Sequence, residues 1–270
     1  MEDLIKVRKT RYRWHKLLII GLATYILGII VLILTGNIVI FPAVVMVGNF
    51  LIPVTYVSFF YERRRFSNVN MTDVVASFFY GGFLGTFAAA ILEPIFITTL
   101  SFKTALVVGI IEEFTKFIGV LFIYRRKRHR LHIDGIILGA AAGMGFAALE
   151  STGYAFTTFL RSRGSLSLTV YVTLLRGILS PLGHGTWTAI LTGVFARENT
   201  EGTFKINRKI INAYIVVVLL HGLWNAVPTV ISAIFSFNSA VLISEVIIGA
   251  IGIIVLMKQW SRANESLYSR

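Results

Sequence analysis

Residues 17–35 read LLIIGLATYILGIIVLILT, a run of 19 residues that contains no charged side chain. A helix needs about 20 mainly apolar residues to cross the hydrocarbon core of a bilayer, so this run predicts a transmembrane helix. The basic residues before the run would also suit a cleavable signal peptide. The run is long for that role, however, and Thr35-Gly36-Asn37 is a poor cleavage site. We therefore expect a retained anchor helix.

Seven further runs of this kind follow along the chain, and its composition agrees with them. Hydrophobic residues make up 56% of the chain and charged residues 14%, whereas soluble domains carry about 25% charged residues. We therefore predict an all-α, polytopic membrane helix bundle that forms one domain over residues 1–270. The absence of cysteine excludes disulfides and thiolate metal sites. The eight predicted spans are 17–35, 39–61, 73–98, 103–124, 133–159, 169–196, 210–233 and 239–258.

The basic residues predict the orientation of these spans. Of the 26 Lys and Arg residues, 21 fall on one side, in residues 6–16, 63–65, 125–130, 197–209 and 258–270, and three fall on the other. Cytosolic loops carry such an excess of positive charge. We therefore expect a multi-pass protein of the cell membrane with a cytosolic N-terminus (1–16) and a cytosolic tail (259–270). The same distribution argues against nucleic acid as the reason for the net charge of +13.

The sequence Glu112-Glu113-Phe114-Thr115-Lys116 places three charges inside one predicted span. A charged side chain at the bilayer centre costs at least ~2.5–3.5 kcal/mol, so these charges indicate a function. Lys116 is four residues after Glu112 and three after Glu113, so it can reach both carboxylates on one helix face. Two neighbouring carboxyl groups in a dry site do not readily both ionise, which suits acid–base chemistry. A structural ion-pair network is the alternative interpretation.

Three other predicted spans carry Glu150, His184 and His221. A rise of ~1.5 Å per residue from the cytosolic ends places these residues and Glu112 at depths of ~16–26 Å, in the middle or outer half of the membrane. Polar groups turn away from lipid and toward the bundle interior, so we expect the four side chains to converge. Glu150 shares a helix face with Phe146, four residues earlier.

A polar stripe is predicted on the span 169–196, where Arg176, Ser180, His184 and Thr188 recur every four residues. Pro181 should bend this helix and free a backbone carbonyl within the site. Arg176 is expected nearer the outer surface, where it would snorkel or pair with a carboxylate. His184 is the more informative residue, because an imidazole serves as a base, a donor or a metal ligand.

His221 and Asn225 are also four residues apart, and together they could donate hydrogen bonds to a developing oxyanion. A helix–helix hydrogen bond is the alternative role. Glu113 or Glu150 could hold Zn²⁺ together with His184 and His221, because a catalytic zinc takes three protein ligands and water. Water activated by a glutamate without a metal is equally compatible with these residues.

These motifs resemble those of the PrsW family of intramembrane proteases, which is related to the CAAX-type prenyl-protein proteases. Glu112-Glu113-x-x-Lys116 resembles the family's EExxK, and Phe146-x-x-x-Glu150 resembles its FxxxE. His184 and the segment His221-Gly-Leu-Trp-Asn225 resemble its later histidine motifs. The resemblance covers about residues 105–230, which we take as the catalytic core helices.

The resemblance implies proteolysis of a single-span, membrane-anchored protein, with anti-sigma factors as the known substrate type. Glu112 would be the general base on water and Glu113 would assist it, while His221 and Asn225 would stabilise the oxyanion. The prenyl-protease relatives have a histidine where this chain has Glu150. A non-catalytic membrane scaffold or an ion- or proton-coupled transporter is the alternative to a protease.

Overall fold

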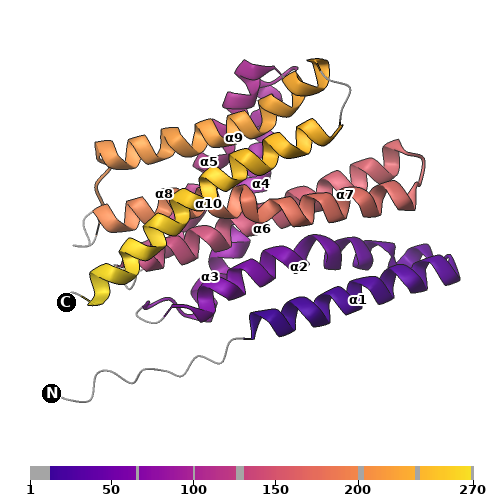
Figure 1. Cartoon of the computed structure of the whole chain (residues 1–270), viewed down its shortest axis with the longest axis horizontal. Helices are drawn as coiled ribbons and strands as arrows, with labels where there is room; N and C mark the ends of the chain where they lie inside the picture. The colour runs from indigo at the N-terminus through magenta and orange to yellow at the C-terminus, as the bar shows by residue number, and fades with distance from the viewer. Residues whose placement is uncertain are drawn as a thin grey trace.

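The computed structural model describes residues 13–64, 67–99, 101–125, 131–199, 204–234 and 238–268. These residues form a helix bundle without any strand, as predicted (Figure 1). The elements are α1 (Trp14–Thr35), η1 (Ile38–Ile40), α2 (Phe41–Glu62), α3 (Met71–Phe79), η2 (Tyr80–Leu84), α4 (Gly85–Phe96), α5 (Phe102–Tyr124), α6 (His132–Arg161), α7 (Leu166–Leu179), η3 (Ser180–Leu182), α8 (His184–Glu198), α9 (Arg208–Ile234) and α10 (Asn238–Tyr268).

Seven segments of the described chain are long and apolar enough to cross a membrane, which makes this a multi-pass membrane protein. The eighth predicted span corresponds to α5, which has 23 residues. Every stretch of α5 long enough to cross a membrane contains Glu112, Glu113 and Lys116. Because of these charges, composition alone does not identify α5 as a membrane-spanning helix. The count of eight spans and the cytosolic placement of both termini therefore stay predictions. Residues 1–12 of the basic N-terminus lie outside the described part of the chain.

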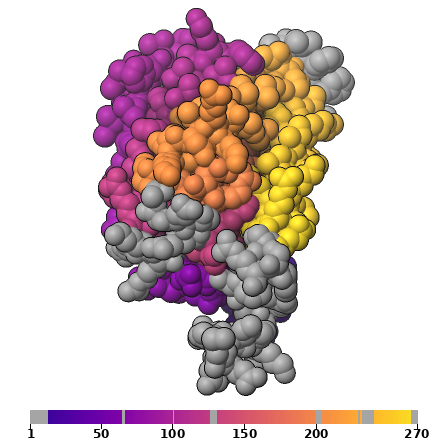
Figure 2. Space-filling view, turned by 90° about the vertical axis from the view of Figure 1, so that its left-hand side faces the viewer, coloured from indigo at the N-terminus to yellow at the C-terminus, as the bar shows by residue number. Residues whose placement is uncertain are grey.

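Helix α6 lies at the centre of the bundle, and 94% of its most apolar stretch is buried. It packs along α8, and small residues make this close approach possible. A Cβ atom on Gly135, Gly139 or Gly143 would collide with backbone or side-chain atoms of α8. The small-residue segment 139–143 is thus a packing seam. Seen end-on, α8 and α9 lie between α10 on one side and α4 and α5 on the other (Figure 2).

The predicted span 169–196 is broken rather than only bent. Helix α7 ends at Leu179, η3 follows, and α8 begins at His184 after Gly183, whose backbone angles are φ −102° and ψ −111°. Pro181 lies in η3, and its carbonyl oxygen accepts a hydrogen bond of 2.5 Å from the Thr186 hydroxyl. Because Pro181 supplies no N–H for the carbonyl of Gly177, four residues earlier, that carbonyl is freed as expected, and it accepts a hydrogen bond from the Ser180 hydroxyl instead. The break places His184 in the first turn of a new helix.

Candidate active site

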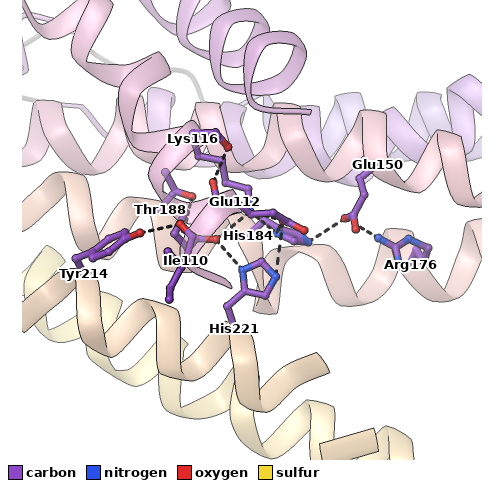
Figure 3. Close-up of polar contacts among 11 residues, drawn as sticks. Ile110, Glu112, Lys116, Glu150, Arg176, His184, Thr188, Tyr214 and His221 are labelled. Carbon is purple, nitrogen blue, oxygen red and sulfur yellow. Dashed lines mark hydrogen bonds and ion pairs between the residues drawn. The ribbon is translucent and has the colours of Figure 1, made fainter. Parts of the chain in front are cut away.

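Three charged residues of α5 form the inner part of the site. Lys116 is fully buried, and its ammonium group donates hydrogen bonds of 2.9 Å to Glu112 Oε2 and 2.9 Å to Glu113 Oε1. The same nitrogen lies 2.7 Å from His184 Nδ1 (Figure 3). It also lies 4.0 Å from the ring centroid of Phe146, a buried residue of α6. Lys116 therefore joins both glutamates as predicted, and it reaches the histidine of α8 as well.

His221 enters the site from α9 and contacts both glutamates. Its Nδ1 lies 3.0 Å from Glu113 Oε1, and its Nε2 lies 3.7 Å from Glu112 Oε2. The hydroxyl of Thr188 donates a hydrogen bond of 3.1 Å to Glu113 Oε2. The indole of Trp187 covers the His221 ring at a centroid distance of 4.8 Å. His221 is thus held at a fixed orientation in a dry environment.

His184 links this inner cluster to a second ion pair, between α6 and α7. Its Nε2 lies 3.1 Å from Glu150 Oε2, and the same carboxylate oxygen accepts a hydrogen bond of 2.7 Å from Arg176. Arg176 also donates from Nε to the Ser151 hydroxyl at 3.2 Å. The expected pairing of Arg176 with a carboxylate is present, and its partner is Glu150.

The hydrogen bonds assign one tautomer to each histidine. Glu113 accepts from Nδ1–H of His221, which leaves the lone pair of Nε2 facing Glu112. Glu150 accepts from Nε2–H of His184, which leaves the lone pair of Nδ1 facing Lys116 and Glu112. A carboxylate on the far nitrogen of a histidine is the usual companion of a metal ligand, because it orients the ring and raises its basicity.

Glu112, His184 and His221 form a group that could hold a metal ion, with ligand atoms within 4.8 Å of one another. The Lys116 ammonium already lies against two members of this group, so it would have to move aside for a metal ion to bind there. Glu113 and Glu150, the acids named for this role from the sequence, instead serve as the outer partners of the two histidines. No comparison tests the ligand set, and both assignments remain predictions.

Ser180, a predicted site residue, makes its hydrogen bond outside this network. Ser180 is buried, and its hydroxyl donates to the carbonyl of Gly177 rather than to His184. Asn225 lies one turn beyond His221 on α9 and is partly buried. Its role in oxyanion binding stays a prediction.

A water-sized cavity lies beside His184. Its volume is about 140 Å³. Its walls come from α6, α7, η3, α8, α9 and α10. The lining residues are Ser151, Leu175, Arg176, Leu179, Ser180, Gly183, His184, Trp224 and Glu245. Since a water molecule takes ~30 Å³ in the liquid, the cavity has room for about four waters next to the ionisable cluster. The cavity is therefore large enough to admit water to the ionisable cluster.

The sequence reasoning missed two acids of this region. Glu93 of α4 lies close enough to Glu112 for the two carboxyl groups to interact. Glu93 is four residues after Ala89, which packs against Ile111 and Phe146. Glu245 of α10 faces the cavity. Both are acids inside predicted spans, the signal that identified Glu112 and Glu150, but neither belongs to a recognised motif.

Comparisons with known proteins agree with this site. A family model described as PrsW family intramembrane metalloprotease matches residues 70–257, which include α5 to α9 and every residue of the cluster. The chain is 27% identical over 167 residues to "Protease PrsW" of Halalkalibacterium halodurans, across 60% of this chain and 73% of that protein. No solved structure shows a significant match.

Proposed function

We propose, on the premise that the chain belongs to the PrsW family of intramembrane metalloproteases, that its buried glutamate–histidine cluster hydrolyses a peptide bond of a single-span, membrane-anchored protein. The observation that supports this most is the paired arrangement around the two histidines. Each ring is fixed by a carboxylate on one nitrogen and presents its other nitrogen toward Glu112. The cavity beside His184 supports the proposal, because it brings water to this cluster.

The donor set fits a zinc ion. His184 Nδ1 and His221 Nε2 each lie 3.7 Å from Glu112 Oε2. Bonds of ~2.0–2.1 Å in a tetrahedron separate ligand atoms by ~3.4 Å, so these two pairs would have to contract slightly. The Lys116 ammonium, which lies 2.9 Å from Glu112 Oε2 and 2.7 Å from His184 Nδ1, would have to move aside. Two histidines and one glutamate form a common catalytic zinc set. When bound, Zn²⁺ would polarise the scissile carbonyl and acidify a water molecule.

The surrounding residues have distinct roles in this proposal. Both oxygens of Glu113 are engaged, by Lys116 and His221 at Oε1 and by Thr188 at Oε2, so Glu113 orients its neighbours and does not meet water. Glu112 uses Oε2 toward Lys116 and the two histidines. In the metal-free form of the proposal, we assign its carboxylate as the acceptor of the proton that the attacking water loses, and as the donor of a proton to the leaving amine. With Zn²⁺ bound, Glu112 would be a ligand of the ion instead.

The test is cleavage of membrane-anchored single-span proteins, anti-sigma factors among them, by the purified protein in detergent. Wild type is compared with Glu112→Gln, each with and without a strong zinc chelator. We expect cleavage by wild type, a loss of at least 100-fold in the variant, and inhibition by the chelator. Cleavage that persists in the presence of the chelator would support the protease function and contradict the role of a metal ion. A wild-type protein that cleaves nothing in a broad library would contradict the proposal and favour a scaffold or a transporter.

A further inference from the structure

The cavity beside His184 is bordered by two charged residues from different helices. Arg176 lies on α7 and Glu245 on α10. Helix α7 packs against α2 and α6, and α10 packs against α8 and α9, whereas α7 and α10 do not pack closely against each other in the described residues, so the cavity lies at the seam between these two helices (Figure 1). A ligand that reaches the cavity from the lipid would pass along this seam.

Glu245 has no evident structural role in the described residues. It is partly buried, about five residues inside the apolar stretch of α10, and none of the observed ion pairs of the described chain includes it. A carboxylate at such a position is costly and marks a functional site by default. Because its side chain faces the cavity, we look for its role there.

Arg176 retains hydrogen-bonding capacity toward the cavity. A guanidinium group has five N–H donors, and two of its nitrogens are used, by Glu150 at 2.7 Å and by Ser151 at 3.2 Å. Its side chain is 27% exposed in the described structure. The remaining donors are therefore accessible beside His184, in the same cavity as the Glu245 carboxylate.

A substrate of an intramembrane protease needs hydrogen-bond partners for the backbone groups that become free when its helix unwinds. Its helix must unwind locally before water can attack a carbonyl, and each freed N–H or C=O group in an apolar environment costs several kcal/mol without a partner. A cavity that offers a cationic donor on one wall and an anionic acceptor on the other satisfies one carbonyl and one N–H group. Its volume of about 140 Å³ limits it to about one residue once its roughly four waters leave.

We propose that the substrate enters between α7 and α10, and that Arg176 and Glu245 bind the backbone of its unwound residue beside His184. This inference rests on the proposed function, and it assigns a substrate-binding role to a residue of α10 outside the motif-bearing helices. Binding precedes chemistry here, so loss of Glu245 should weaken cleavage without unfolding the protein.

The kinetic test compares Glu245→Leu and Glu245→Gln with a matched change, Glu265→Leu, on the same helix. Glu265 is exposed near the end of α10 and accepts a hydrogen bond from Ser261. We expect kcat/KM for a membrane-anchored substrate to fall at least tenfold in Glu245→Leu. It should recover in Glu245→Gln, whose amide oxygen still accepts a hydrogen bond, and stay at the wild-type value in Glu265→Leu. Thermal midpoints should agree among all variants.

A second test locates the substrate directly. The chain has no cysteine, so single cysteines can carry a photoactivatable cross-linker in the inactive Glu112→Gln background. Val241 is one turn before Glu245 on the cavity face, and Ile247 is 55% exposed on the lipid-facing side of α10. We expect the substrate to cross-link from position 241 and not from 247.

The outcomes of these two tests distinguish a failure of this inference from a failure of the proposed proteolytic function. The proposed entrance and subsite are contradicted if wild type cleaves its substrate while Glu245→Leu keeps full kcat/KM. They are also contradicted if the substrate cross-links from position 247 as strongly as from position 241. In both cases the proposed protease function is unaffected. If wild type cleaves no substrate, the proposed function and this inference fall together.

Discussion

The pairing of Glu113 with His221 allows a quantitative prediction about metal binding. Glu113 accepts from His221 Nδ1 at 3.0 Å, from Lys116 at 2.9 Å and from Thr188 at 3.1 Å. Glu113→Gln keeps the size of the side chain but removes the charge that orients His221 and raises its basicity. Loss of such an outer partner typically lowers metal affinity by a factor of about 10–100. We therefore expect the dissociation constant for Zn²⁺ to rise by that factor, or about 1.4–2.7 kcal/mol.

The assay is a zinc titration of the detergent-solubilised protein in competition with a chromophoric chelator. Substitution with Co²⁺, whose visible absorption reports coordination, gives a second readout that needs no substrate. The Glu112→Gln variant, which removes a proposed ligand, should lose more affinity than Glu113→Gln.

Asp134→Asn is the matched control. Asp134 is as fully buried as Glu113, and it accepts hydrogen bonds from Ser67 and Asn68 at the start of α6, away from the site. Its change to the amide tests whether any buried acid affects the titration through stability alone. The reasoning would be refuted if Glu113→Gln bound zinc as tightly as wild type, or if Asp134→Asn weakened binding to the same extent.

Two further predictions concern stability, measured as the free energy of unfolding in mixed detergent. A Cβ atom on Gly139 would collide with Thr192 in the α6–α8 seam, whereas one on Gly153 of the same helix meets nothing within 4 Å. Gly139→Ala should therefore lower the free energy of unfolding by about 1–3 kcal/mol. Gly153→Ala should leave it unchanged or raise it by up to about 1 kcal/mol. Equal effects of the two changes would contradict the packing seam. Lys116→Met leaves two buried carboxylates without their shared cation, so it should destabilise by about 3–5 kcal/mol. A loss below about 1 kcal/mol would show that these carboxyl groups do not need that charge.

The helical class and the main apolar segments could be predicted from the sequence because a bilayer imposes a simple rule. A chain that crosses hydrocarbon must satisfy its backbone internally over about 20 residues, and hydropathy records this requirement locally. The same rule identified Glu112, Lys116 and Glu150, since charges inside apolar runs are costly. One prediction from this reasoning was wrong in detail. The span 169–196 was expected to be one bent helix, whereas in the structure the helix breaks at Gly183.

The relations among the site residues were decided by tertiary structure. Spacing on one helix joins Lys116 to Glu112, but only the approach of α6, α8 and α9 selects which histidine nitrogen meets which carboxylate. For the same reason the group that could hold a metal ion contains Glu112 in place of Glu113 or Glu150. Glu93 and Glu245 belong to no local motif, and the packing of α4 and α10 brings them to the site. The amino-acid sequence by itself determined which groups are buried in the membrane, because that depends on local composition. Their partners depend on contacts between residues far apart in the chain, which only the packed bundle specifies.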